Sequence, residues 1–384
     1  MKRIYLDHAA TTPARPEAVA AMLPLLTEGG YNPSSIHAEG RAARAALDDA
    51  RALVARNLGV QPRAVIFTGG GSESIALALF GAARAAAPGR RHAVTSVVEH
   101  HAVLHAMEQL EDDGWTVTRL PVGASGTVDP AAFAAALRPD TALASIMLAN
   151  NELGSISPIA ELAALTKRAG AVFHTDAVQG PALLDVDATA LGVDLLSISG
   201  HKFYGPKGVG ALVVRGGVPL VPLIVGGGQE NGLRAGTENV AGIAGLAVAL
   251  DLARAERAAL RARLGELRDR LENGIRAAVP GALINAAGAP RLANLCSVAF
   301  ADLDASALLI RLDLEGISAS AGSACAAGSL EPSHVVAALG VPEPYRTGVI
   351  RFSLGRASTS GEIERVLAAL PQIVAEVRGT AAVV

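Results

Sequence analysis

Four short polar segments could carry chemistry, and each follows an apolar run that is typical of a buried strand. They are residues 69–72, 99–101, 174–179 and 197–202. The first is Gly-rich and precedes a helical pattern, so its exposed N–H groups and the positive helix end suit a phosphate. His100 can stack on a flat ring or relay protons. Asp176 can hold a proton on a heterocyclic nitrogen, and Lys202, when partly removed from water, can form a Schiff base.

Each segment also has an ordinary structural interpretation, which the sequence leaves open. The glycines can form a tight turn, His100 and Asp176 can cap helices, and Lys202 can be a loop lysine. The chain has four lysines among its 33 basic residues, which favours a role for Lys202 that arginine does not fill. Taken together, the four segments suit pyridoxal 5′-phosphate, which needs an anion site, a partner for its ring nitrogen and an amine for its aldehyde.

The elements that would position these groups alternate between helix and strand from about residue 14 to residue 250. Strands are predicted at residues 64–68, 92–98, 116–122, 142–148, 171–175, 195–199 and 210–214, and helices at 15–27, 38–57, 72–86, 101–112 and 159–169. Ser72 is expected to cap its helix. This spacing predicts a mostly parallel sheet with helices on both faces, where ligands bind beyond the carboxyl ends of the strands.

A long helical pattern at residues 239–279 connects this region to a smaller C-terminal one. There, strands are predicted at residues 297–300 and 349–353, and helices at 306–314 and 333–339. The predicted fold class is therefore α/β, with a mostly parallel central sheet. A large cofactor-binding domain is expected at residues 14–250, and a smaller α+β domain at residues 1–13 and 251–384.

The composition excludes several classes of protein. Hydrophobic residues make up 51% of the 384 residues and charged residues 18%, which indicates a folded chain with a large core. The net charge of −3 gives no reason to expect a nucleic acid partner. No apolar run is long enough for a transmembrane helix, so no membrane is expected, and the N-terminus lacks the apolar segment of a secretory signal.

The two cysteines, Cys296 and Cys325, are too few for a disulfide framework or a four-cysteine metal site, and no metal is expected. The reducing cytoplasm is the expected location. Cys296 lies in a strand-like run and is expected to be a buried structural thiol. Cys325 lies among small residues at positions 320–332, a composition that predicts an exposed and mobile loop.

The chain resembles the cysteine desulfurases, which are fold-type I pyridoxal-phosphate transferases of the class V aminotransferase family. The matching segments span nearly the whole chain: YLDHAATTP at residues 5–13, NPSS at 32–35, NNE at 150–152, SGHK at 199–202, RAGTEN at 234–239 and RFSLGR at 351–356. The Cys325 loop has the longer form, similar to the iron–sulfur-cluster and nitrogen-fixation desulfurases. Many relatives read Gly-Ala-Thr-Glu-Ser where residues 70–74 read Gly-Gly-Ser-Glu-Ser, so Ser72 keeps a hydroxyl for the phosphate.

The resemblance implies a role for each candidate residue. Lys202 would bind the cofactor aldehyde, Asp176 would pair with the pyridine nitrogen, and His100 would stack on the ring and act in acid–base catalysis. Further cofactor contacts would come from Asn151 and Gln179 at the ring substituents and from Gly71, Ser72, Ser199 and His201 at the phosphate. Thr237 would reach the phosphate of a neighbouring subunit, which implies a homodimer with shared sites. Arg351, with Asn151, would bind the substrate carboxylate.

The reaction that the resemblance implies converts L-cysteine to L-alanine and leaves the sulfur as a persulfide on Cys325. The thiolate of this cysteine would be the nucleophile. The sulfur would then pass to an acceptor protein, for iron–sulfur cluster or thio-cofactor biosynthesis, with tRNA thiolation included. The sequence does not name that acceptor.

Other functions stay open at this stage. A selenocysteine lyase, or another class V enzyme, would share most of these residues and differ in its turnover of selenocysteine. A partner-dependent sulfur-relay scaffold would use Cys325 but release no alanine by itself. A nicotinamide-dependent dehydrogenase is disfavoured because no G-x-G-x-x-G turn follows the first predicted strand.

Overall fold

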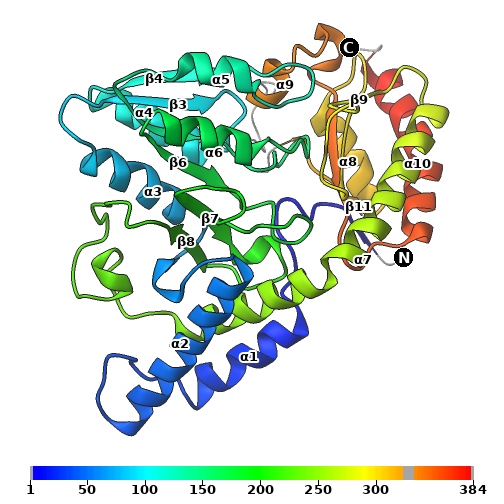
Figure 1. Ribbon diagram of the computed structural model, residues 1–384. Helices are drawn as coiled ribbons and strands as arrows, with labels where there is room; N and C mark the ends of the chain where they lie inside the picture. Colours follow the sequence, from blue (N-terminus) through cyan, green and yellow to red (C-terminus); the bar gives the residue numbers. More distant parts are fainter. Residues whose placement is uncertain (1–2, 323–332, 382–384) are drawn as a thin grey trace.

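A computed structural model describes residues 3–322 and 333–381. Its main sheet has seven strands in the order β2-β8-β7-β6-β5-β3-β4 (Figure 1). They are β2 (Val65–Thr68), β3 (His92–Ser96), β4 (Thr116–Leu120), β5 (Thr141–Ser145), β6 (Val172–Asp176), β7 (Leu195–Ser199) and β8 (Gly210–Val214). Strand β8 runs antiparallel to β2 and β7, and the other neighbouring pairs are parallel, which confirms the mostly parallel sheet.

The central strands are buried on both faces, so buried and exposed residues do not alternate along them, although several of the buried residues are polar. Every residue of β7, and of β2 at the edge of the sheet, is buried. Burial also explains why three strands end earlier than predicted, β3 at Ser96, β4 at Leu120 and β5 at Ser145. Residues 146–149, for example, stay buried after β5 although the regular pairing has ended. The apolar pattern therefore marks burial rather than the end of a strand.

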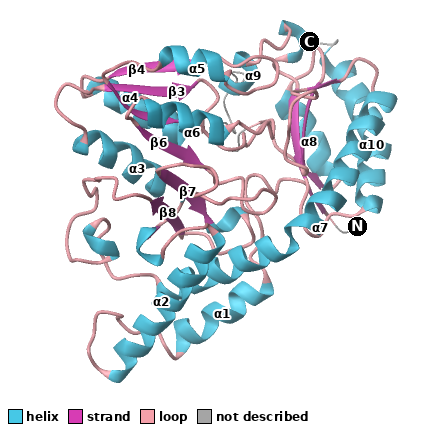
Figure 2. Cartoon of the chain, in the orientation of Figure 1, coloured by secondary structure: helices cyan, strands magenta, loops and turns pink. Residues whose placement is uncertain are grey.

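Helices cover both faces of this sheet (Figure 2). Helices α3 (Gly71–Ala85) and α4 (His101–Asp112) pack on one face. Helices α2 (Ala38–Asn57), α6 (Ile159–Arg168) and the first half of α7 (Val240–Ala278) pack on the other. Helix α1 (Pro16–Thr27) lies against α7, and the short helix α5 (Pro130–Ala136) lies against α6.

The expected cap of α3 is wrong. The helix begins at Gly71, and its cap residue is Gly70, which makes no side-chain cap hydrogen bond. Gly70 has a φ of 149°, a backbone conformation that favours glycine. A Cβ atom at Gly210, on the neighbouring strand β8, would lie 2.8 Å from the Gly70 backbone, so the two segments approach closely. The chain therefore turns into the helix before Ser72, and the Ser72 hydroxyl is left for another partner.

A second hydrophobic core surrounds the far half of α7. Its strands are β9 (Leu283–Ile284), β10 (Leu295–Ala299) and β12 (Val349–Ser353), which form an antiparallel sheet, and β1 (Ile4–Tyr5), which pairs with β11 (Ile317–Ser318). Its helices are α8 (Ala305–Leu314) and α10 (Ser360–Ala381). Ile4 and Leu6 are buried in this core. The domain bounds at residues 13/14 and 250/251 stay a prediction.

Short elements complete the chain. Helix α9 (His334–Ala338) lies between the two cores, with Val335 packed in the first and Val336 against Ala299 of β10. The 3₁₀ turns are η1 (Pro62–Ala64), η2 (Gly200–Lys202), η3 (Glu230–Gly232) and η5 (Glu343–Tyr345). Cys296, in β10, is fully buried, as predicted. Among the described helices, none combines the length and the apolar character needed to cross a membrane.

Candidate functional site

The predicted site residues meet at a cavity of about 270 Å³ beyond the carboxyl ends of β6 and β7. Its lining includes Gly71, Ser72, His100, Asn151, Asp176, Gln179, Ser199, His201, Lys202 and Arg351, with Ala9, Ala10 and Met147. Thr237 is exposed and does not line this cavity. Cys325 lies outside the described residues.

Lys202 ends the 3₁₀ turn that follows β7, and its amine is held by the N-terminal segment. The Nζ atom donates hydrogen bonds to the carbonyl oxygens of Ala9, at 2.6 Å, and Ala10, at 2.8 Å. The amide of Gln179 donates to the same Ala9 oxygen at 2.9 Å. The sequence pattern gave no sign of these two carbonyls, because residues 9–10 lie outside any regular element. They aim the Lys202 amine along one wall of the cavity.

Asp176 is the last residue of β6 and is 5% exposed. Its Oδ1 accepts a hydrogen bond from the Val178 N–H at 2.9 Å. Burial raises the pKa of this carboxyl to about 6, against the lowering effect of the Lys202 charge. A cationic N–H group placed beside Asp176 would favour the ionised carboxylate. A protonated ring nitrogen of a heterocycle is such a group.

A second buried carboxyl, Glu99, lies next to His100 and is not among the predicted site residues. Its Oε1 accepts hydrogen bonds from Ser96 Oγ at 2.6 Å and the Met147 N–H at 3.1 Å. Its Oε2 is buried and has no partner among the described residues. Burial raises the pKa of Glu99 to about 8, so the carboxyl is mainly neutral at pH 7. In the sequence, the position of Glu99 within the polar segment 99–101 could have marked it as a candidate site residue.

His100 caps helix α4 and also lines the cavity. Its interpretation as a helix cap is confirmed, and its role against a flat ring or in proton transfer stays a prediction. Its Nδ1 accepts a hydrogen bond from the Ala102 N–H at 3.1 Å at the start of α4. Burial, and then the charge of Lys202, lower the pKa of the ring to about 4. The ring is therefore neutral at pH 7, and an Nδ1 that accepts leaves the proton on Nε2. His100 thus offers a flat neutral face and a donor.

The start of α3 forms a second, adjoining hollow of about 460 Å³ with Ser199 and His201. A Cβ atom at Gly71 would lie 2.9 Å from Val178 Cγ2, so glycine allows the close packing there. The Glu73 carboxylate, which also lines this hollow, forms an ion pair with Arg234 Nε at 2.9 Å and accepts a hydrogen bond from the Gly69 N–H at 2.8 Å. The N–H groups of the first helical turn, with the positive helix end, make this hollow a place for an anion.

Arg351 projects from β12 of the second core and is 1% exposed. Its Nη1 donates to the Asn151 carbonyl at 2.9 Å, and its Nη2 donates to Asp7 Oδ1 at 2.7 Å. Its Nε is buried and has no partner among the described residues. The side chain of Asn150 turns away to bond the Val98 carbonyl at 2.9 Å, whereas Asn151 lines the cavity. Asp7 is a further residue without a predicted role.

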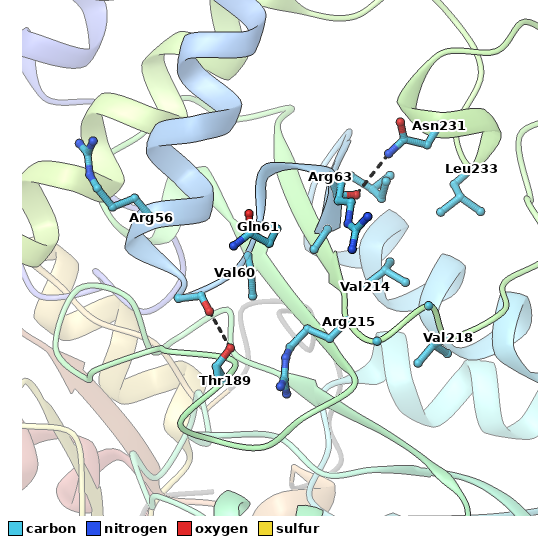
Figure 3. A pocket seen from close by; sticks show the side chains of 15 residues that line it. Arg56, Val60, Gln61, Arg63, Thr189, Val214, Arg215, Val218, Asn231 and Leu233 are labelled. Carbon is cyan, nitrogen blue, oxygen red and sulfur yellow. Dashed lines mark hydrogen bonds between the residues drawn. The ribbon is translucent and has the colours of Figure 1, made fainter.

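A wider groove, of about 760 Å³, lies at the opposite edge of the sheet, beyond the amino ends of β2 and β7 (Figure 3). Arg56, Arg63 and Arg215 line it. Thr189 Oγ1 donates to the Gly59 carbonyl at 2.6 Å, and the Asn231 amide donates to the Arg63 carbonyl at 3.3 Å. None of the predicted site residues that the structure describes lines this groove.

Comparison with known proteins identifies the family. The family model that matches is Aminotransferase class-V, over residues 4–366. A cysteine desulfurase IscS of Dictyoglomus turgidum is 48% identical over 379 residues, which are 98% of this chain and 96% of that protein.

Two solved structures are also similar. A NifS-like protein is 36% identical with a TM-score of 0.91 and covers 97% of this chain and 100% of its own. The structure described as SspA in complex with cysteine is 36% identical with a TM-score of 0.80 and covers 91% of this chain and 98% of its own.

Proposed function

We propose a reaction for a chain that belongs to the aminotransferase class-V family and, within it, to the cysteine desulfurases. The substrate is L-cysteine, the amino-acid product is L-alanine, and the sulfur passes to an acceptor protein. One observation carries the proposal: a half-buried amine, Lys202, a buried carboxyl, Asp176, and a buried guanidinium, Arg351, line a single cavity. The presence of cysteine in the similar SspA structure supports this choice of substrate.

The residues fit pyridoxal 5′-phosphate as the cofactor. The hollow at Gly71, Ser72, Ser199 and His201 has donors for a phosphate and glycine where a Cβ would clash. Asp176 supplies the carboxylate for the pyridine nitrogen and Lys202 the amine for the aldehyde, with His100 against the ring and Asn151 and Gln179 at its substituents. When bound, the cofactor supplies an electron sink for bonds at the substrate Cα.

Arg351 binds the substrate carboxylate. Its guanidinium already has the planar set of donors that two carboxylate oxygens need, and its Nε is unpaired among the described residues. Asp7 holds Nη2 at 2.7 Å, so a substrate carboxylate competes with Asp7 for this group. Asn151 lies on the same wall and borders the bound amino acid.

The proton transfers are divided between two side chains. The Lys202 amine, once its proton is lost, takes the proton from the substrate Cα, and the carbonyls of Ala9 and Ala10 orient it for this task. His100 presents its Nε2 proton as a hydrogen-bond donor, because its Nδ1 is occupied as an acceptor at the start of α4. In acid–base catalysis this ring would act through Nε2, since full transfer of that proton requires a second proton to reach Nδ1.

The sulfur step uses Cys325, which lies outside the described residues. Its thiolate attacks the substrate sulfur, and a sulfur–sulfur bond forms while the Cβ–sulfur bond breaks. The electron pair stays with the substrate carbon, which takes a proton and becomes the methyl group of alanine. The persulfide then serves an acceptor protein in iron–sulfur cluster or thio-cofactor biosynthesis. A thiol that must stay reduced places the reaction in the cytoplasm.

We also propose a homodimer with shared sites. Thr237 is exposed in the segment that follows η3, and Val225, before η3, is 77% exposed. Further apolar side chains are exposed at and after helix α1, where Leu26 is 62% and Ile36 is 90% exposed. A second copy that covered these side chains could receive Thr237 at its phosphate site.

The variant Cys325→Ala tests the proposed reaction. It should keep the absorption spectrum of the bound cofactor and its shift when L-cysteine is added, yet release no alanine and form no persulfide. Assays with L-cysteine and L-selenocysteine in parallel then distinguish a desulfurase from a selenocysteine lyase. Full alanine release by Cys325→Ala would remove this residue from the reaction.

A further inference from the structure

One buried carboxyl contacts the residues on both sides of the segment 323–332, which are Gly322 and Ser333. Glu152, 2% exposed, follows Asn151 in the turn after β5. Its Oε2 accepts a hydrogen bond from Ser333 Oγ at 2.6 Å. A Cβ atom at Gly322 would lie 2.5 Å from the same oxygen and 3.6 Å from Ser333 Cβ. Gly322, with a φ of 73°, therefore packs directly on the Glu152 carboxyl, where only glycine leaves room.

A further hydrogen-bonded contact lies on each side of this segment, and each contact joins it to an element that carries a residue of the cavity. On the N-terminal side, Ser320 and Arg351 exchange backbone hydrogen bonds at 3.1 Å and 2.7 Å. On the C-terminal side, His334 Nε2 lies 3.0 Å from the carbonyl oxygen of Glu99, the residue before His100. The ends of the segment are therefore fixed to the strand that carries Arg351 and to the turn that carries His100.

The hydrogen bond between Ser333 and Glu152 has a defined direction. The Ser333 hydroxyl accepts from the Val335 N–H at 3.1 Å, as the N-cap of α9. Its single proton is therefore given to Glu152. Burial raises the pKa of Glu152, and the hydrogen bond from Ser333 and the charges of Arg351 and His101 oppose that rise. Burying a carboxyl costs free energy, so the contact of Glu152 with both Gly322 and Ser333 indicates a function for this residue.

We propose that Glu152 is a positioning residue that holds both ends of the segment carrying Cys325, so that the thiol meets the substrate bound at Arg351. The proposal rests on the proposed function, because it assigns Cys325 the attack on the substrate sulfur.

Two substitutions at Ser333 test the anchor. Ser333→Asn and Ser333→Asp both keep a good N-cap for α9, but the asparagine amide can donate to Glu152 whereas the aspartate repels it. The rate of persulfide formation in a single turnover is measured by mass spectrometry of the alkylated protein. The Asp variant should be at least about tenfold slower, and the Asn variant within about threefold of wild type. The L-cysteine concentration for half-maximal rate should change less than about twofold, since Arg351 keeps its partners.

The double variant Glu152→Gln with Ser333→Asp should recover most of the lost rate, because the glutamine amide donates to the new carboxylate. A loss of fold alone would not be rescued in this way. Asp129→Asn, at the N-cap of the short helix α5 away from the cavity, is the control and should keep the wild-type rate. Wild-type persulfide formation in Ser333→Asp, or no recovery in the double variant, would overturn the proposal. Alanine release by Cys325→Ala would instead overturn the proposed function.

Discussion

The two hollows at opposite edges of the main sheet differ in size and in chemistry. The cavity at Lys202 has a volume of about 270 Å³, and the groove at Arg215 has about 760 Å³. In the groove, polar groups bond to the protein itself: Arg215 Nη1 donates to the carbonyls of Ala188 and Val193, at 3.0 Å and 2.6 Å. At the cavity, Arg351 Nε is buried without a partner among the described residues, and the same holds for Glu99 Oε2 next to His100.

The difference shows that volume is a poor guide to where reactions occur. Buried polar groups left unpaired are costly, so one that lines a cavity, such as the Arg351 guanidinium, is a candidate to bind a ligand. The pKa values of His100, Asp176 and Glu99 are all shifted by burial on the cavity side. Such shifted groups are typical of functional sites. Each prediction below therefore tests a residue near the cavity. Where possible, the control is a residue of the same type at the amino ends of the parallel strands.

The largest effect is expected from Lys202→Ala. Loss of its proton transfer alone should lower alanine formation by about 10² to 10⁴-fold, and borohydride should no longer link the cofactor to the chain. Lys167→Ala changes an exposed lysine in the last turn of α6, at the amino edge of the sheet, and should keep wild-type activity. Borohydride labelling of Lys167 or Lys207 in the wild-type protein would contradict the role of Lys202.

Glu99→Gln should alter how stability depends on pH. In the wild type, the folded state keeps the Glu99 proton up to a pKa of about 8, whereas the unfolded state releases it near 4.5, so stability falls as the pH rises between these values. Glutamine does not titrate. Between pH 4.5 and pH 7, the free energy of unfolding of the variant, measured with urea, should therefore rise relative to that of the wild type by on the order of 3 kcal/mol. If the free energies of unfolding of the variant and the wild type changed equally with pH, Glu99 would not keep its proton in the folded state.

Asp176→Asn and Asp194→Asn compare two half- or fully buried carboxyls at opposite edges of the sheet. Asp194 precedes β7, and its Oδ2 accepts a hydrogen bond from the Phe173 N–H at 2.9 Å. At saturating cofactor, Asp176→Asn should lower kcat for alanine formation about a hundredfold, because it removes the charge that stabilises a protonated ring nitrogen. Asp194→Asn should change kcat less than about twofold. Equal effects of the two substitutions would remove the distinction between the edges.

Arg351→Lys and Arg215→Lys compare two arginines, and the expected effect is the smallest. Lysine cannot form the paired hydrogen bonds of a guanidinium with a carboxylate. The KM for L-cysteine should rise about tenfold in Arg351→Lys, with a smaller change in kcat. In Arg215→Lys both constants should stay at the wild-type values. A KM unaffected by Arg351→Lys would place the substrate carboxylate elsewhere.

Much of the fold follows from local patterns, although some elements do not. Strands β7, β8 and β12 and helices α2 and α4 have the predicted bounds. Helix α10 is missing from the expected elements, although Ile363, Val366, Leu370 and Val374 recur at helical spacing and are buried. The pairing of β1 with β11 has no local signal, since two strands of two residues each meet across the length of the chain.

The sequence by itself determined which groups gather at the cavity from the main sheet. His100, Asp176 and Lys202 each follow a strand, and parallel strands bring their carboxyl ends to one edge whatever the details of packing. The resemblance to a known family added Arg351, which lines the cavity, and Cys325, which lies outside the described residues.

The tertiary structure alone decided the contacts that cross between the two cores. Only packing places Arg351 against Asp7, turns Asn151 rather than Asn150 to the cavity, and sets Glu152 between Gly322 and Ser333. Local patterns record how strongly each residue is buried and in which element, because those depend on near neighbours. Which distant residue completes a buried hydrogen bond depends on how the second core docks, and that information is spread over the whole chain.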